Sequence, residues 1–236
     1  MFRTFYMAIY FILYLISLTP KKFTLNKLKE QNNLIEYENL ISNITYHWGK
    51  KTFDASGSTL EVEGLENIPE GPIVVISNHQ GFFDIPVLLF AIHKPISFIA
   101  KIELATIPIF GTWMKLIKCI FIDRDNPRQS LKAINSGVNL LKEGHSMVIF
   151  PEGTRSKGST MGEFKKGSLR LATKAKVPIL PVTIKGTYKI LEDNNKRIKP
   201  SKVKVVISKP IYTDNLSKEE ESMLSDQVYD IVNSNL

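Results

Sequence analysis

The chain has 236 residues, of which 43% are hydrophobic and 23% are charged, and its formal net charge is +8. This length allows one sizeable hydrophobic core, or a core with a small appended module. The single cysteine, Cys119, excludes internal disulfides and any multi-cysteine zinc or iron–sulfur site, and we expect neither a metal nor a cofactor.

The basic charge is concentrated in one part of the chain. Residues 115–204 hold 20 Lys or Arg against 7 Asp or Glu, whereas the rest holds 11 against 16. This regional charge favours an anionic partner surface such as phosphate groups, anionic lipid or an acidic carrier protein, with a solvated lysine-rich face as the alternative. The region has no recognised nucleic-acid-binding motif, so nucleic acid is disfavoured as a partner.

An uncharged stretch of 17 residues, rich in Phe, Tyr, Ile and Leu, lies between Arg3 and Lys21. As a helix it would be about 25 Å long, slightly short of a hydrocarbon core of about 30 Å, so it could span a bilayer or lie in its interface. No small-residue cleavage site follows Leu18, which favours a retained anchor over a removed signal peptide. The lysines after it favour a cytoplasmic position, at the cell membrane, for the rest of the chain.

A second segment carries apolar residues at steps of three and four, the pattern of one helix face. These residues are Leu34, Tyr37, Ile41, Ile44 and Trp48. A core helix is one interpretation, but the preceding anchor and lysines favour a membrane-apposed helical hairpin. We therefore expect a membrane-anchoring two-helix module over residues 1–50 and an α/β domain over residues 51–236.

The middle of the chain alternates strand and helix patterns. The predicted strands are Ile73–Ile76, Ile96–Ala100, Ile120–Ile122, Met147–Phe150, Ile179–Ile184 and Val203–Ile207. The predicted helices are Ile85–Ile92, Ser130–Leu141, Gly167–Ala175 and a C-terminal helix that begins at a capping box formed by Ser217 and Glu220. This alternation predicts an α/β fold with a mostly parallel or mixed central sheet flanked by helices.

Polar residues follow several of these strands closely. His79, Arg124 and Glu152 each come one to three residues after a predicted strand. In open α/β sheets the ligand lies beyond the carboxyl ends of the strands, so these three side chains are expected to converge at one edge.

His79 and Asp84 are separated by five residues around Gly81. If Gly81 and its neighbours form a turn, Asp84 can accept a hydrogen bond from one imidazole nitrogen and leave the other nitrogen free to take a proton. The alternatives are a helix N-cap for Asp84 and a satisfied loop position for His79. Capping and orienting are compatible, because a carboxylate has two oxygens.

The segment FPEGTRS, residues 150–156, begins where a strand ends. Arg155 can grip a phosphate through two parallel hydrogen bonds, and Arg124 in FIDR provides a second arginine. Glu152 would repel phosphate, so it must pair with an arginine or accept a hydrogen bond from a substrate hydroxyl. A turn with a surface ion pair is the alternative interpretation.

Together these blocks resemble the glycerolipid acyltransferase family, and within it the 1-acyl-sn-glycerol-3-phosphate (lysophosphatidate) acyltransferases. NHQGFFD matches the H-x4-D motif, FIDR the second block, FPEGTRS the third and VPILPV, residues 177–182, the fourth. The resemblance extends from about Val62 to Ile211, with the four blocks in the order of the family.

The resemblance implies a role for each block. His79 would be the general base and Asp84 would orient it. Arg124, Arg155 and Lys101 would hold the acceptor phosphate, while Glu152, Gly153 and Thr154 would shape the glycerol site. Pro178 would help to form the wall of the acyl-chain groove. Lys118 stands where the family usually has glycine, and it could crowd the acceptor site or add charge to it.

The function implied is transfer of an acyl group from acyl-CoA or acyl carrier protein to the sn-2 hydroxyl of lysophosphatidic acid, which forms phosphatidic acid. The partners implied are this lysolipid, the acyl thioester and a phospholipid bilayer. Another lysolipid or glycerol 3-phosphate is an alternative acceptor. A non-catalytic module that binds anionic lipid, and a hydrolase, are alternatives of other classes, although the chain lacks the G-x-S-x-G elbow of many hydrolases.

Overall fold

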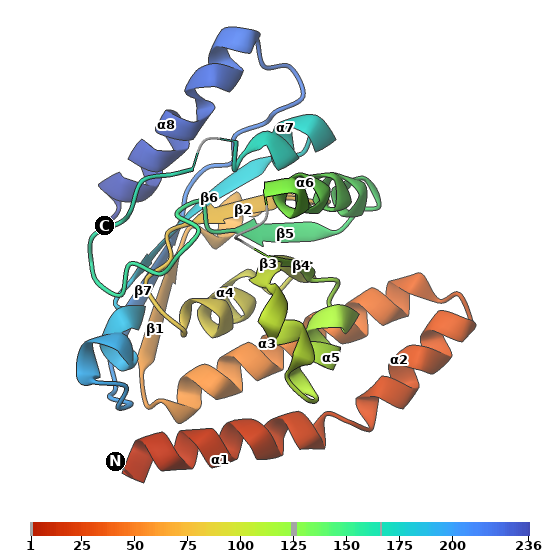
Figure 1. Cartoon of the computed structure of the whole chain (residues 1–236), viewed down its shortest axis with the longest axis vertical. Helices are drawn as coiled ribbons and strands as arrows, with labels where there is room; N and C mark the ends of the chain where they lie inside the picture. Colours follow the sequence, from red (N-terminus) through yellow and green to blue (C-terminus); the bar gives the residue numbers. More distant parts are fainter. Residues whose placement is uncertain (1, 124–126, 166) are drawn as a thin grey trace.

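The computed structural model describes residues 2–123, 127–165 and 167–236. Among these residues, seven strands form one sheet with helices on both faces (Figure 1). The strands are β1 (Thr59–Glu63), β2 (Val74–Ser77), β3 (Ile96–Lys101), β4 (Ile120–Ile122), β5 (Ser146–Ile149), β6 (Ile179–Lys185) and β7 (Lys202–Ile207). The α-helices are α1 (Phe2–Ser17), α2 (Lys21–Glu30), α3 (Leu34–Ala55), α4 (Asp84–Ile92), α5 (Phe110–Leu116), α6 (Pro127–Lys142), α7 (Arg170–Ala175) and α8 (Lys218–Ser234).

The strand order is β1-β7-β6-β2-β5-β3-β4, and neighbouring strands are parallel except for the antiparallel pair β6 and β7. The sheet is therefore mixed, as predicted. In the central register, Val75 of β2 lies beside Val148 of β5 on one side and Leu180 of β6 on the other. Since β2, β3, β4, β5 and β6 run in the same direction, their carboxyl ends meet at one edge of the sheet.

The six predicted strands are all present, and their ends differ from the prediction by at most one residue. The strand β1 was not predicted, because its sequence TLEVE places charged residues between apolar ones. This strand forms the edge of the sheet and pairs only with β7 among its described neighbours. An edge strand needs no continuous apolar run, because one side of it faces solvent.

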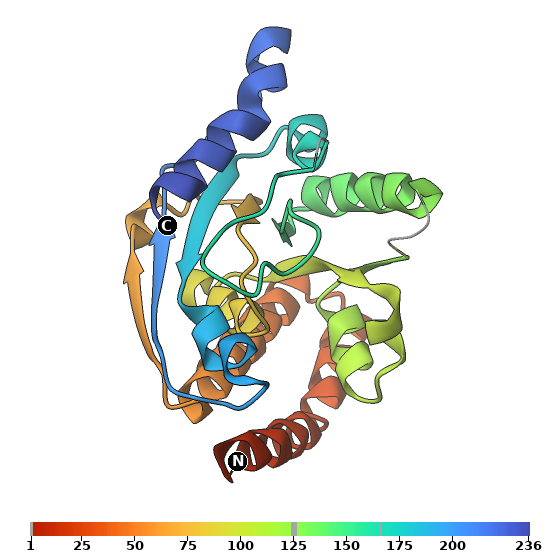
Figure 2. The same cartoon turned by 60° about the vertical axis from the view of Figure 1, so that its left-hand side comes forward.

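Hydrophobic clusters fill the two faces of the sheet. One cluster joins the sheet to α1, α3, α4 and α5, and the other joins it to α6, α7 and α8. Alternate residues of a strand enter opposite clusters, as Val74 and Val75 of β2 do. Figures 1 and 2 show the corresponding layers, with α4 on one side of the sheet and α6 on the other.

The predicted C-terminal capping box is confirmed. The Ser217 hydroxyl accepts a hydrogen bond from the Glu220 backbone N–H, and the Glu220 carboxylate accepts one from the Ser217 N–H. These bonds satisfy two of the backbone donors that a helix leaves unpaired at its start. They fix the beginning of α8, whose apolar stripe packs against the sheet.

Three helices rather than two precede the sheet, because the short helix α2 lies between the two predicted segments (Figure 1). The predicted domain boundary at residue 50 falls inside α3, which continues to Ala55. Ile41, Ile44 and Trp48 of α3 are buried in the hydrophobic cluster shared with α4, whereas Leu34 is exposed. The second half of this apolar stripe is thus part of the protein core.

The N-terminal segment Phe2–Glu30 is long and apolar enough to cross a membrane, judged by length and composition. In the structure α1 packs lengthwise on the domain: Arg3 Nη1 donates to the Ser56 carbonyl at 2.7 Å, and the ring of Phe11 contacts those of Trp48 and Phe110. Its outward face is apolar and exposed. The exposed large side chains of this face are Phe2, Phe5, Tyr6, Ile9, Ile12, Leu13 and Ile16.

Candidate active site

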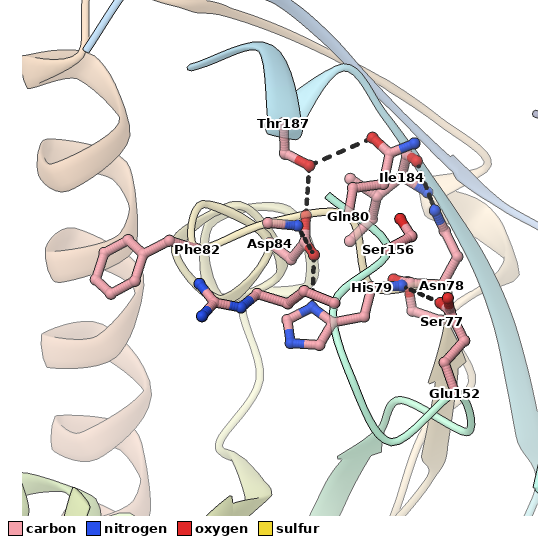
Figure 3. A network of polar contacts seen from close by, with 12 residues as sticks. Ser77, Asn78, His79, Gln80, Phe82, Asp84, Glu152, Ser156, Ile184 and Thr187 are labelled. Carbon is pink, nitrogen blue, oxygen red and sulfur yellow. Dashed lines mark hydrogen bonds and ion pairs between the residues drawn. The ribbon is translucent and has the colours of Figure 1, made fainter. Parts of the chain in front are cut away.

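His79 and Asp84 meet in the loop between β2 and α4. The Nδ1 atom of His79 lies 2.6 Å from Oδ2 of Asp84, and the same oxygen accepts a hydrogen bond from the Gly81 N–H at 2.8 Å. The turn at Gly81 therefore brings the two side chains together. The Asp84 side chain is fully buried and His79 is 15% exposed. The second ring nitrogen, Nε2, points away from Asp84 (Figure 3).

Two neighbouring amides anchor this loop to β6. The Asn78 side chain donates to the Ile184 carbonyl and accepts from its N–H, at 2.9 and 2.8 Å. The side-chain oxygen of Gln80 accepts from the Gly186 N–H at 2.8 Å. Because Asn78 and Gln80 flank His79 in the sequence, these bonds restrain the backbone on both sides of the imidazole.

Glu152 ties the third block to the first. One of its oxygens accepts a hydrogen bond from the His79 N–H at 2.6 Å, and the other accepts from the Gly162 N–H at 2.8 Å. The side chain is buried, and this burial raises the pKa of the carboxyl although the two backbone bonds oppose the rise. Glu152 therefore binds backbone amides in this structure, rather than an arginine as one of the sequence interpretations required.

The third block also runs along the first through its own backbone. The Ser156 N–H donates to the His79 carbonyl at 2.8 Å, and the Lys157 N–H donates to the Gln80 carbonyl at 3.1 Å. The imidazole stacks on the Phe150 ring, with centroids 4.0 Å apart and planes inclined by 15°. His79 is thus held by its backbone, by its Nδ1 atom and by one face of its ring.

Gly153 and Thr154 connect Glu152 to Arg155. Gly153 has a φ of +70°, and a Cβ atom at this position would lie 2.8 Å from Nζ of Lys165. The backbone conformation therefore favours glycine, whereas the flexible end of the Lys165 side chain could move away from a Cβ atom. Thr154 lines the cavity described below.

The predicted phosphate-binding cations stand at the same edge but are more exposed. The Arg155 side chain is 43% exposed, and its Nη1 atom lies 3.4 Å from the Glu192 carboxylate. The Lys101 side chain, at the end of β3, is 53% exposed and lies 2.5 Å from the Glu103 carboxylate. Arg124, the third predicted cation, lies outside the described residues.

An apolar cavity of about 490 Å³ adjoins the imidazole. It lies between α1, α3, α4 and α5, and His79, Lys101 and Arg155 are among its polar lining residues. Its apolar lining includes Leu15, Ile44, Trp48, Phe82, Ile85, Leu89, Phe98, Phe110, Trp113, Met114 and Ile117. Cys119 also lines it, and burial raises the pKa of this thiol to about 12, so Cys119 is a neutral part of the wall.

Two residues singled out from the sequence lie elsewhere. Pro178 precedes β6, where its carbonyl accepts from the Val74 N–H at 2.9 Å, and it is absent from the cavity lining. It lies at the amino end of β6, so the structure does not bring it to this cavity. Lys118 precedes β4 and contacts Glu38 and His145 at the amino ends of the parallel strands, the edge of the sheet opposite the candidate site. Its side chain neither crowds the predicted acceptor site nor adds charge to it.

Three polar residues of the site were not predicted from the sequence. The Thr187 hydroxyl donates to Asp84 and lies 3.4 Å from the side-chain oxygen of Gln80. That Gln80 oxygen accepts from the Gly186 N–H, while Glu192 accepts from the Phe82 N–H and contacts Arg155. Gln80 lies inside the first block and could have been considered there. Thr187 and Glu192 follow the fourth block after Gly186, whose φ of +92° marks a turn, but the sequence does not show which loop this turn contacts.

The arrangement is suited to proton transfer. The buried carboxylate fixes one nitrogen of the imidazole, and the other nitrogen is left to act as an acid or a base next to an apolar cavity with cations at its mouth. Within the described ranges, no three His, Cys, Asp or Glu side chains gather as they would around a metal ion.

The chain is similar in sequence to proteins of one known family. The profile of the Acyltransferase family matches residues 59–185. A chloroplast 1-acyl-sn-glycerol-3-phosphate acyltransferase of Arabidopsis thaliana is 38% identical over 175 residues, which cover 72% of this chain and 49% of that protein. A probable 1-acyl-sn-glycerol-3-phosphate acyltransferase of Mycoplasma pneumoniae is 34% identical over 73% of this chain and 69% of that protein.

A solved structure shows the same similarity across nearly the whole chain. The crystal structure of PlsC, the 1-acyl-sn-glycerophosphate acyltransferase of Thermotoga maritima, superimposes with a TM-score of 0.80 at 30% identity, covering 96% of this chain and 93% of that one. The chain spans about half the length of the two plant relatives, from Arabidopsis thaliana and Brassica napus. The chain therefore belongs to the acyltransferase family, together with these 1-acyl-sn-glycerol-3-phosphate acyltransferases.

Proposed function

We propose that the protein transfers a fatty acyl group from an acyl thioester to the sn-2 hydroxyl of 1-acyl-sn-glycerol-3-phosphate and so forms phosphatidic acid. The acyltransferases to which the chain is similar carry this acceptor in their names. Acyl carrier protein and coenzyme A are both suitable donors, because both are anionic and this chain carries a net positive charge. The reaction needs no further cofactor.

The observation that carries the proposal is the meeting of three features at one edge of the sheet. They are the His79–Asp84 pair, the apolar cavity and the cations Arg155 and Lys101. The cavity volume lies within the roughly 300–1,000 Å³ of typical ligand pockets, and its lining is mostly apolar, as a fatty acyl chain requires. The cations at the same site suit a phosphate monoester.

The geometry supports the following reaction. Nε2 of His79 takes the proton of the sn-2 hydroxyl while the hydroxyl oxygen attacks the thioester carbonyl carbon. Asp84 stabilises the imidazolium that forms. When the tetrahedral intermediate collapses, the carbon–sulfur bond breaks and the leaving thiolate takes the proton from Nε2. No acyl-enzyme intermediate is required, so the chain needs no nucleophilic serine.

Arg155 would bind the acceptor phosphate, with Lys101 and Arg124 assisting. Arg155 now faces Glu192 across 3.4 Å, a distance too long for a strong ion-paired hydrogen bond. A phosphate can therefore compete for the guanidinium. Glu152 and Gly153 would shape the glycerol site indirectly, because both fix the backbone that carries Arg155.

The proposal is tested with purified protein, a labelled acyl thioester and lysophosphatidic acid in detergent micelles. We expect phosphatidic acid from the wild type and a loss of at least about 100-fold for His79→Ala, because the base is removed. His47→Ala, an exposed histidine on α3, is the matched control and should retain wild-type activity.

Other outcomes of this assay would change the function assigned to the protein. Equal rates for His79→Ala and the wild type would exclude His79 as the base. Free fatty acid as the sole product would indicate a hydrolase, and binding of lipid without any product would indicate a non-catalytic module. Preference for glycerol 3-phosphate or another lysolipid would change the acceptor but keep the chemistry.

We also propose that α1 lies in the membrane interface, with the catalytic domain on the cytoplasmic side of the cell membrane. One face of α1 packs on the domain through Phe11 and Leu15, while the other exposes its apolar side chains. A helix held lengthwise against a domain is better placed to lie in the interface than to cross the bilayer. The lysines of α2, Lys21, Lys27 and Lys29, are exposed and suit anionic headgroups.

Flotation with vesicles of mixed zwitterionic and anionic phospholipid tests this placement. The double change of Phe5 and Ile12 to serine should weaken partitioning at least about 10-fold, since each large apolar side chain contributes roughly 1.5–3 kcal/mol when fully buried. Tyr212→Ser is the control, because Tyr212 is equally exposed but lies far from α1 in the sequence. Equal flotation of all three proteins would exclude α1 as the membrane-binding element.

A further inference from the structure

The buried carboxylate of Asp84 has a hydrogen-bond partner at each oxygen. Oδ2 is shared by Nδ1 of His79 and the Gly81 N–H, as described above. Oδ1 accepts a hydrogen bond from the Thr187 hydroxyl at 2.5 Å (Figure 3). Asp84 and Thr187 are both fully buried, so water does not replace this donor.

Thr187 reaches Asp84 from a distant part of the chain. It begins the short 3-10 helix η3 (Thr187–Ile190), directly after β6 and Gly186. Gly186 has a φ of +92°, and a Cβ atom there would lie 2.5 Å from the Lys202 carbonyl oxygen. Any other residue would therefore strain the turn, and the turn that only glycine allows sets the position of the Thr187 side chain.

The direction of the hydrogen bond follows from the donors available. A threonine hydroxyl has one proton, and the Thr187 oxygen lies 2.5 Å from Asp84 Oδ1 but 3.4 Å from the Gln80 side-chain oxygen. The proton therefore belongs to the contact with Asp84. The Gln80 oxygen already accepts from the Gly186 N–H, so its bonding does not depend on Thr187.

This bond restricts the rotation of the carboxylate. With Oδ1 held by Thr187, Oδ2 remains directed at Nδ1 of His79. Nδ1 then keeps its proton and Nε2 is the unprotonated nitrogen, the tautomer that a general base requires. We propose that Thr187 is a positioning residue that acts through Asp84 to hold His79 in its reactive orientation and tautomer. This inference rests on the proposed role of His79 as the base.

Three variants test the assignment. Thr187→Val keeps the shape of the side chain and removes the hydroxyl, whereas Thr187→Ser keeps the hydroxyl. Thr183→Val is the matched control, because Thr183 is a fully buried residue of β6 whose hydroxyl donates to the Val232 carbonyl at 2.9 Å, without contact to Asp84. Both valine variants thus lose one buried hydrogen bond from the same segment.

In the acyltransferase assay we expect kcat of Thr187→Val to fall about 10- to 100-fold, the size of effect known for partners that orient metal-binding histidines. The KM values for donor and acceptor should change little, because Thr187 touches neither substrate. Thr187→Ser and Thr183→Val should keep kcat near the wild-type value. If Thr187→Val and Thr183→Val lose the same activity, the hydroxyl is only structural and the inference is overturned.

Proton NMR gives a measurement that does not depend on turnover. The Nδ1 proton of His79, bonded to Asp84, should give a strongly downfield signal, identified by its loss in His79→Gln. We expect it to shift or disappear in Thr187→Val and to persist in the other two variants. An unchanged signal in Thr187→Val would overturn the inference. Failure of the wild type to form phosphatidic acid would instead overturn the proposed function, whatever the NMR result.

Discussion

The candidate active site has two halves, one that we propose transfers a proton and one that we propose binds a phosphate. They differ in how much of their geometry exists before any substrate binds. In the proton-transfer half, Asp84 is fully buried and His79 is 15% exposed, and both are held by hydrogen bonds from several segments. In the phosphate-binding half, Arg155 and Lys101 are 43% and 53% exposed and lie beside carboxylates.

This difference follows from what each half must do. Proton transfer requires a donor and an acceptor at one fixed distance, so the surrounding structure sets the imidazole in advance. A phosphate is bound by charge and by long side chains that can adjust, and water stabilises these side chains until the ligand arrives. The comparison predicts that variants of the buried half lower kcat, whereas variants of the exposed half change the use of the acceptor.

The largest effect in the exposed half is expected for Arg155→Ala. Loss of charge-assisted hydrogen bonds, worth roughly 1.5–3 kcal/mol, should lower kcat/KM for the acceptor about 10- to 100-fold and leave the KM for the thioester nearly unchanged. Arg170→Ala, an exposed arginine on α7, is the control. A fall in kcat with no change in acceptor dependence would show that Arg155 does not bind the acceptor phosphate. The proposed difference between the two halves would then not hold for this residue.

A smaller effect is expected for Glu192→Gln, and it concerns the stability of the fold at the exposed half rather than activity. Burial raises the pKa of the Glu192 carboxyl above the ordinary value of 4.5. The folded protein then keeps a proton that the unfolded chain releases, so the free energy of unfolding falls as pH rises from about 4.5 to the raised pKa. In Glu192→Gln this fall should be shallower, because Glu152 is then the remaining carboxyl of the site whose pKa burial raises.

Denaturant unfolding at a series of pH values measures this slope for the two proteins. The glutamine can still accept the Phe82 hydrogen bond, so the loop itself should remain in place. A steeper slope in Glu192→Gln, or no difference, would show that the carboxyl at the phosphate side does not couple its protonation to folding.

Much of the fold could be predicted because its signals are local. The strands β2, β5 and β6 are mostly apolar, since both of their faces are covered, and turn residues bound them clearly. β1 was missed because an edge strand with alternating charged residues lacks an apolar run. The helices α2 and α5 were missed as well, and α2 offers little apolar pattern because Phe23, Leu25 and Leu28 are its only apolar residues.

The part of the candidate site that depends on local structure was predictable as well. Gly81 lies between His79 and Asp84, so their meeting depends on one short turn. Lys118 shows the limit of such reasoning. Its position beside the second block suggested the acceptor site, but with a φ of +59° its side chain reaches Glu38 at the opposite edge.

The sequence by itself determined the alternation of strands and helices, the pairing of an imidazole with a carboxylate, and the family motifs that point to acyl transfer. Only the tertiary structure decided that Thr187 completes the bonding of Asp84 from 103 positions away. It also decided that α1, α3 and α5 enclose the cavity. The physical reason is that periodicity and turn chemistry act between neighbours in the chain, whereas burial and hydrogen bonding join segments that come together only on folding.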